Sequence, residues 1–258
     1  MAMNPRLLRP LASGKNPETL DWITAVYAAG SSVNTATANA VDEFVSGCKS
    51  DGIWDAIKAC CVLCGPDTLA GALVPLVGTA PTNNNFVAGD YNRLTGLVGD
   101  GSTKYLDSNR NNNADPQDDK HFSVYLSESI AATQNFFGAL PSTGTGRSTF
   151  DYTSGNVRAF VNTHPNPVNF AGPVSGFLGA NRSSSASFVA RNGGSTVTAS
   201  EASQTPYDGN LFVFTRNLSG SPSGYSATRI AFYSIGEALD LEALDTRVSA
   251  LITAIGNS

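Results

Sequence analysis

After about residue 80, the chain changes to short runs in which apolar and polar side chains alternate, separated by clusters of Gly, Ser, Asn and Pro. A period of two is the pattern of strands that bury one face, and the clusters are typical of turns. The runs recur at roughly 8–12 residues with no helical pattern between them, which predicts a mainly β chain built as an antiparallel β-sandwich or jelly roll. The predicted strands are GLVGDGSTKYL, HFSVYLS, NFFGAL, RSTFDYT, VRAFVN, GFLGANR, ASFVARN, STVTAS, NLFVFTRN and ATRIAFYSIG.

Helical spacing precedes these strands, between residues 16 and 80. Apolar side chains that recur every three or four residues predict helices from Pro17, over Thr35–Cys48 and over Asp51–Cys60. In the third of these, Ile53, Trp54, Ile57 and Cys61 form the apolar stripe. The candidate N-caps are Asn16 or Thr19 for the first helix and Asn34 or Thr35 for the second.

A further helix closes the chain, with Asp240 as its predicted N-cap and an apolar stripe from Leu241 to Ile255. These patterns divide the chain into three parts. Residues 1–15 are predicted to form an extended attachment segment, residues 16–80 a helical module, and residues 81–258 the jelly roll with its C-terminal helix.

Composition narrows the classes of function. The net charge of −5 argues against nucleic acid as a partner, because binding to phosphates needs a basic surface. No apolar run approaches the roughly 18 residues of a membrane span, so membrane insertion is not expected. Only 14% of the residues are charged while Gly, Ser, Thr and Asn abound, which is typical of extracellular or virion β proteins.

The residues that catalysis requires are scarce. The chain has two histidines, His121 and His164, and neither lies in the context of a nucleophile elbow. Asp151 is the one acid after residue 107 that falls inside a predicted strand, so a glycosidase would lack its second carboxylate. The four cysteines lie between residues 48 and 64 in apolar sequence, buried in a helix or a strand, and form no complete zinc site. The chain is therefore predicted not to be an enzyme.

Charged and amide side chains are concentrated between Asp107 and Lys120, which the pattern places in a loop. The three alternatives are a metal loop, a ligand-binding loop and a solvated connection. The carboxylates of Asp115 and Asp119 are hard oxygen ligands of the kind that calcium prefers, although the spacing matches no EF-hand; no other cofactor is expected. The candidate ligand-binding residues are Asp107, Asn109, Arg110 and Asn112.

Specific motifs stand in three places: DGIWDAIKA, GDGSTKYLDS and RIAFYSIGEALD. With the segments around them, these motifs resemble tailed-phage and cyanophage virion proteins that carry a laminin-G-like, concanavalin A-type sandwich. The resemblance extends over nearly the whole chain, but residues 128–205 match only in their general sequence pattern and contain no specific motif. It implies a lectin-like jelly roll in a tail fibre, baseplate or capsid surface, with no catalytic residues to carry over.

The predicted function is that of a non-enzymatic phage virion protein, assembled in the host cytoplasm, that acts as a tail fibre or baseplate-type adhesin. Its predicted partners are other virion proteins, host surface glycans and further copies of the chain. The alternatives are a capsid decoration or cement protein without a ligand and, third, a glycan-cleaving enzyme.

Two structural expectations follow from single segments. The leader NPRLLRPLASG is predicted to attach to a neighbouring virion protein through Arg6, Leu7, Leu8 and Arg9, because its prolines favour an extended backbone. Phe212 and Phe214 share one parity of their strand, and they are predicted to lie together in the core between the sheets.

Overall fold

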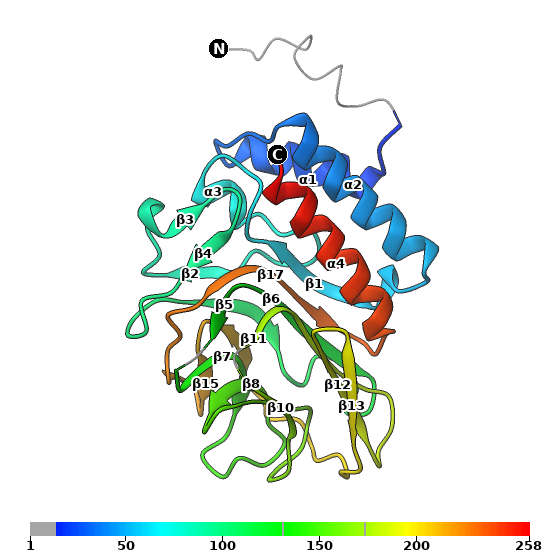
Figure 1. Ribbon diagram of the computed structural model, residues 1–258, viewed down its shortest axis with the longest axis vertical. Coiled ribbons are helices and arrows are strands. Elements are labelled where there is room, and N and C mark those ends of the chain that lie inside the picture. The colour runs from blue at the N-terminus through cyan, green and yellow to red at the C-terminus, as the bar shows by residue number, and fades with distance from the viewer. Residues whose placement is uncertain (1–13, 131, 173) are drawn as a thin grey trace.

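The computed structural model describes residues 14–130, 132–172 and 174–258. They form three layers: a layer of helices, a first sheet beneath it and a second sheet at the far side (Figure 1). Among the described residues, the strands of both sheets pair antiparallel except β7 with β15. The prediction of a mainly β sandwich with a C-terminal helix is confirmed.

The first sheet has eight strands in the order β13-β12-β11-β6-β17-β4-β3, with β1 also paired to β17. Its long central strands, β6, β11 and β17, carry both a face toward the helices and a face toward the second sheet. The strands are β1 Ile57–Val62, β3 Tyr91–Asn92, β4 Gly96–Val98, β6 Lys120–Ile130, β11 Val174–Arg182, β12 Phe188–Asn192, β13 Ser195–Ala199 and β17 Arg229–Gly236.

The second sheet has nine strands, seven of them in the order β10-β9-β8-β7-β14-β5-β2. The hairpin β15–β16 joins this sheet through β7. The strands are β2 Thr82–Asn84, β5 Tyr105–Asn111, β7 Gln134–Leu140, β8 Ser148–Thr153, β9 Asn156–Phe160, β10 Val168–Ala171, β14 Asn210–Val213, β15 Arg216–Leu218 and β16 Ser221–Ser223.

Aromatic rings fill the space between the sheets. Phe122 of the first sheet stacks on Phe137 of the second at a centroid distance of 5.1 Å and contacts Phe150 at 4.7 Å. Phe214 belongs to this core, as predicted, but Phe212 does not share its face. Phe214 has a φ of 70°, and this left-handed backbone breaks the alternation of the strand. Phe212 therefore points to the outer face of the second sheet.

The helices α1 Pro17–Ala28, α2 Thr35–Ser50 and α4 Leu241–Gly256 cover the outer face of the first sheet (Figure 1). The Asn34 side chain accepts from the amide of Thr37 and caps α2. Asp240 caps α4 by accepting from two amides, as the sequence predicts. Asn16 stands at the N-cap of α1 without a side-chain capping bond. The short elements are α3 Leu69–Ala72 and the 3-10 turns η2 Trp54–Ala56 and η3 Ala88–Asp90.

The predicted third helix over Asp51–Cys60 is wrong, because the chain forms η2 and then strand β1 there. Side chains of β1 alternate between two cores: Cys60 and Val62 face the helices, while Cys61 faces the second sheet. A strand that is buried on both faces is apolar throughout, so its sequence alone does not distinguish it from a buried helix. The four cysteines are buried free thiols.

The predicted loop over residues 107–120 is partly wrong as well, since β5 extends to Asn111. The polar residues of β5 alternate with buried Leu106 and Ser108, so they lie on a strand that has one face toward solvent. The division of the chain at residue 80 stays a prediction.

Candidate ligand-binding face

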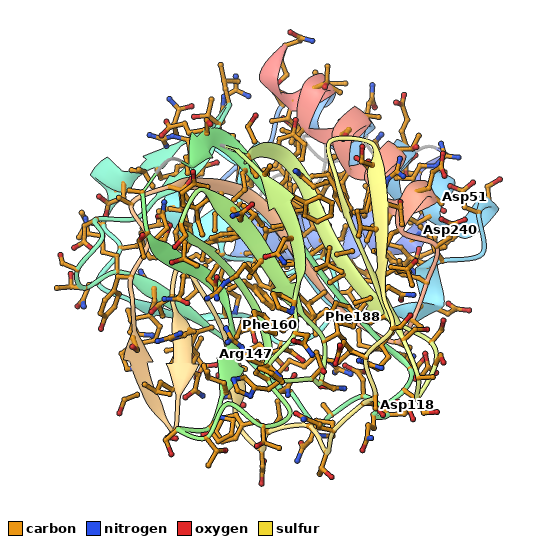
Figure 2. All side chains as sticks on the ribbon, turned by 60° about the horizontal axis from the view of Figure 1, so that its bottom comes forward. Asp51, Asp118, Arg147, Phe160, Phe188 and Asp240 are labelled. Atoms are coloured by element: carbon orange, nitrogen blue, oxygen red, sulfur yellow. The ribbon has the colours of Figure 1, made fainter. Side chains whose placement is uncertain are left out.

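The outer face of the second sheet carries a row of polar and aromatic side chains. Opposed residues of neighbouring strands share a face of a sheet, and residues of opposite parity, such as Leu106 and Val213, point into the core. Figure 2 turns this side of the molecule toward the viewer. From β9 to β2, the strand register gives the row Phe160, Thr149, Gly138, Phe212, Asp107 and Thr82.

A carboxylate held by two arginines forms the charged half of this face. Arg158 donates from Nε to Asp151 Oδ1 at 2.6 Å and from Nη2 to Oδ2 at 3.0 Å. Arg147 donates from Nη2 to Asp151 Oδ2 at 2.9 Å. The Arg147 guanidinium also lies over the ring of Phe160, with Cζ 3.8 Å from the centroid (Figure 2). Both oxygens of Asp151 are therefore engaged, and the stacked pair forms the floor of the cluster.

Arg216 of β15 is the third arginine of the cluster. Burial lowers its pKa, Asp151 opposes that change, and Arg158 lowers the pKa further. Burial likewise lowers the pKa of Arg147 to about 10, with Asp151 opposing and the other two arginines adding to the effect. Arg216 Nε is buried and has no hydrogen-bond partner among the described residues. Two guanidinium groups thus pair with one carboxylate, and a third lies near enough to be affected by its charge.

Aromatic rings form the other half of the face. Tyr105 lies 4.9 Å from Phe212 and 6.2 Å from Tyr225 between ring centroids. Asp107 accepts a hydrogen bond from Asn210 Nδ2 at 3.2 Å beside them. Hydroxyl, amide and carboxylate groups therefore surround a partly exposed aromatic cluster.

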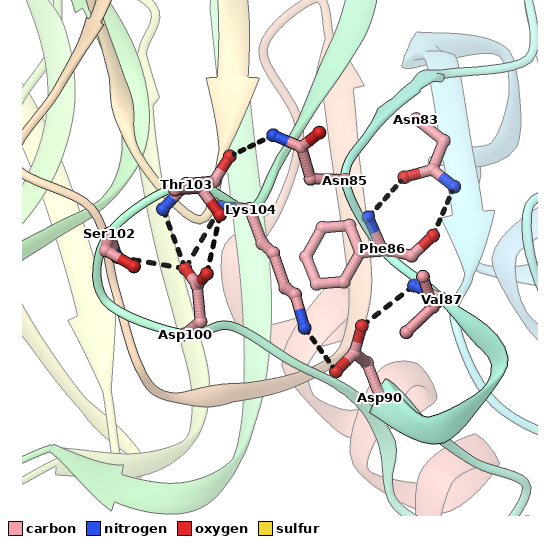
Figure 3. A network of polar contacts seen from close by, with 9 residues as sticks. All are labelled: Asn83, Asn85, Phe86, Val87, Asp90, Asp100, Ser102, Thr103 and Lys104. Carbon is pink, nitrogen blue, oxygen red and sulfur yellow. Dashed lines mark hydrogen bonds and ion pairs between the residues drawn. The ribbon is translucent and has the colours of Figure 1, made fainter.

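Asp100 fixes the turn that leads into Tyr105 (Figure 3). Its carboxylate accepts from the amides of Ser102, Thr103 and Lys104 and from the Thr103 hydroxyl. Burial opposes ionisation, but these hydrogen bonds outweigh it and lower the pKa of Asp100. Lys104 also donates to Asp90. The turn is held by its own polar contacts, which positions the aromatic half of the face.

The predicted ligand-binding residues separate into two groups. Asp107 and Asn109 lie on the outer face, where Asn109 donates from Nδ2 to the Ala80 carbonyl at 2.8 Å. Arg110 instead forms an ion pair with Asp115, and Asn112 is buried at the end of the sandwich. The structure therefore brings half of the predicted set to the face.

The two predicted calcium ligands, Asp115 and Asp119, form hydrogen bonds with different partners. Both oxygens of Asp115 accept from Arg110, and Asp119 accepts from the amide of Ala238. In residues 14–130, 132–172 and 174–258, no group of three or more His, Cys, Asp or Glu side chains is placed to hold a metal ion. Calcium binding stays a prediction.

Two buried basic residues lie at the start of β6. The Lys120 ammonium donates to the Asn112 carbonyl, and burial lowers its pKa to about 7. His121 lies 2.6 Å through Nδ1 from the Glu237 carbonyl and 3.0 Å through Nε2 from the Ser234 hydroxyl. Burial lowers the pKa of His121 to about 4. A carbonyl only accepts, so Nδ1 carries the proton and the ring is a neutral structural group.

The sequence analysis did not identify Arg147, Arg158 and Arg216 as site residues. The strand pattern could have indicated two of them. RSTFDYT places Arg147 and Asp151 on the same face of a strand, and VRAFVN does the same for Arg158 and Phe160. Asp151 is also not the one acidic residue inside a strand after residue 107. Glu128 lies inside β6 of the first sheet, where it pairs with Arg229. The attachment residues Arg6, Leu7, Leu8 and Arg9 lie outside the described residues.

The fold and this face define a two-sheet β-sandwich with one covered and one polar outer face. No family model and no curated protein matches the chain. Solved structures that resemble it include domains LG4-5 of the mouse laminin alpha1 chain, with 14% identity, a TM-score of 0.38 and coverage of 65% of this chain and 47% of that one. The chain thus spans about half the length of that laminin fragment.

Two further structures carry sugar-related names. One is the CBM40 of the Ruminococcus gnavus IT-sialidase, with 12% identity, a TM-score of 0.34 and coverage of 52% of this chain and 83% of that one. The other is domain 4 of the arabinanase AbnA from Geobacillus stearothermophilus, in complex with arabinotriose, with 12% identity, a TM-score of 0.29 and coverage of 68% and 82%. Likenesses this distant carry no argument about the ligand of this chain. Among the described residues, no helix is both long and apolar enough to cross a membrane.

Proposed function

We propose that this chain is a non-enzymatic, lectin-like protein of a phage virion, an adhesin of the tail fibre or baseplate type that binds host surface glycans. The observation that carries the binding role is the outer face of the second sheet, where Tyr105, Phe212 and Tyr225 lie beside Asp107 and Asn210. Sugar rings present C–H faces that pack on aromatic rings and hydroxyls that pair with amides and carboxylates.

Two of the side chains considered for catalysis, Asp151 and His121, are engaged in other contacts. Asp151 accepts from two arginines with both oxygens, so neither oxygen is free to act on a glycosidic bond. The His121 ring is enclosed between Glu237 and Ser234. These contacts support a binding role over glycan cleavage.

The proposed virion role rests on the three motifs named above. It implies other virion proteins and further copies of the chain as partners. Several copies on one particle would multiply a weak glycan contact into firm attachment. A decoration protein would instead use this face to contact the capsid.

A glycan array tests the binding role. The full chain should bind a subset of oligosaccharides, and Tyr225→Ala should weaken that binding at least about tenfold while leaving the melting temperature within a few degrees. Val197→Ala is the control, because Val197 is exposed on β13 of the first sheet. An array without any bound oligosaccharide would refute the lectin role, and a particle reconstruction with the face buried against capsid subunits would favour decoration.

A further inference from the structure

Resting on the proposed glycan-binding function, we infer that the ligand is a carboxylate-bearing sugar and that Arg158 and Arg216 bind its carboxylate. The charge, the exposure and the unpaired polar atoms of the arginine cluster indicate this class of ligand and the position of its charged group on the face.

The cluster carries an excess of positive charge. Arg147 and Arg158 pair with Asp151, and Arg216 lies on β15 beside them, so three positive groups stand against one negative group. Among the described contacts, the two oxygens of Asp151 are taken by Arg147 and Arg158. A partly buried excess of positive charge is unfavourable unless an anion reaches it. A neutral sugar would leave that excess uncompensated.

Exposure distinguishes an inner pair of the cluster from an accessible group. The side chains of Asp151 and Arg147 are 4% and 7% exposed, whereas that of Arg158 is 33% exposed. Arg147 is further held by two hydrogen bonds to the Thr149 hydroxyl. Asp151 and Arg147 are therefore the inner pair of the cluster, whereas the side chain of Arg158 is accessible and Arg216 is half-buried.

Two polar atoms near the cluster lack hydrogen-bond partners. Arg216 Nε and Asn135 Oδ1 are buried without a hydrogen-bond partner in the part of the chain that the structure describes. Asn135 is opposite Asp151 in the register and donates to the Gly224 carbonyl, while Arg216 is opposite Ser223. Both atoms thus lie beside the cluster. Buried polar atoms require partners, and a sugar acid supplies an acceptor carboxylate for the donor and a hydroxyl for the acceptor.

The aromatic half adjoins this position. Tyr225 follows Gly224 in the chain and lies 6.2 Å from Tyr105. A sugar whose carboxylate lies at Arg158 and Arg216 therefore has an aromatic surface for its ring beside it. Guanidinium groups favour carboxylates because their charged N–H groups donate strong hydrogen bonds to them, and Arg158 keeps Nη1 beside the Nε and Nη2 that donate to Asp151.

The test compares acidic oligosaccharides with their own neutral counterparts. The probes are oligomers of galacturonate, glucuronate and mannuronate, each also with the carboxyl groups reduced to alcohols. The full chain should bind at least one acidic oligomer at least about tenfold more tightly than its reduced form, as expected for a charge-assisted hydrogen-bond pair. Sulfated oligosaccharides without carboxylates serve as a comparison, and equal binding to them would overturn the assignment to carboxylate.

The variant Arg216→Gln should abolish the preference for the acidic oligomer without lowering affinity for the reduced form. Arg158→Gln should do the same, while Arg229→Gln, on the first sheet, should change neither. Melting temperatures check that each variant is folded. A full chain that binds neutral oligosaccharides but no acidic ones would refute this inference and leave the glycan-binding function standing; a chain that binds no oligosaccharide would refute both.

Discussion

The two sheets have opposite outer faces although their strands follow the same alternation. The outer face of the first sheet carries Phe177 and Phe232 and packs under three helices. Three of its polar residues, His121, Ser123 and Ser234, pair with one another and with the backbone. The outer face of the second sheet instead carries charged groups and rings that no described helix covers. On the covered face these polar side chains therefore bond to one another, whereas the open face carries charged side chains that a ligand can contact.

The largest expected effect is on the covered face. Phe232→Ala should lower the free energy of unfolding by about 3–5 kcal/mol, because the fully buried ring packs on Phe44 at 5.7 Å and would leave a cavity. Chemical denaturation measures this change. The exposed Val197→Ala is the control, with about 0.5 kcal/mol or less. A loss no larger than the control's would mean that the helices do not pack on this face as described.

A second variant concerns the charged half of the open face. Asp151→Asn should cost about 3 kcal/mol, because it removes the anion that compensates the buried Arg147. Glu128→Gln is the matched control, since its pair with Arg229 is half exposed and worth about 1 kcal/mol or less. Equal losses in the two variants would show that the arginines of the cluster are well solvated, which would weaken the charge argument.

The third prediction uses pH to probe the covered face. His121 has a pKa of about 4 in the folded protein, below its ordinary value of 6.5. Between those pH values the unfolded chain therefore binds a proton at His121 that the folded chain does not bind. The stabilising contribution of neutral His121 should be fully present above about pH 6.5. The free energy of unfolding should then fall by on the order of 2–3 kcal/mol as the pH decreases toward 4.

Melting temperatures from pH 4 to 7 measure this dependence. His121→Gln should flatten the profile, and His164→Gln, which alters an exposed ring, should not. A wild-type profile identical to that of His121→Gln would mean that the ring is hydrated and charged.

The smallest expected effect concerns the edge of the helical layer. Asp240→Ala should cost about 1 kcal/mol, because the carboxylate caps two amides of α4. Glycan binding on the far sheet should be unchanged. A large loss of binding in this variant would indicate that the two outer faces are coupled.

The sequence predicted most of the fold because most strands bury only one face. The runs HFSVYLS and RSTFDYT alternate visibly, and both appear as strands where expected. β1 was missed because both of its faces are buried, which removes the alternation. Phe212 was misplaced because the left-handed backbone at Phe214 reverses parity, and parity alone cannot reveal such a residue.

The candidate site was harder to predict, because it depends on which strands become neighbours. Asp107 and Asn109 were identified from local composition and do lie on the open face. Arg158 and Asp151 are separated by one turn and could have been paired from their parity. Arg216 comes from a hairpin far along the chain, so its place beside Asp151 follows only from the packing of β15 on β7.

The most direct test of the central claim is to map amide chemical shifts of the full chain on titration with the three acidic oligosaccharides. We expect the largest changes on β5, β8, β9 and β14 and around Arg216 and Tyr225, and no changes on α1, α2 and α4. Changes concentrated on the helices, or no changes at all, would contradict the claim that the open face of the second sheet is the binding surface.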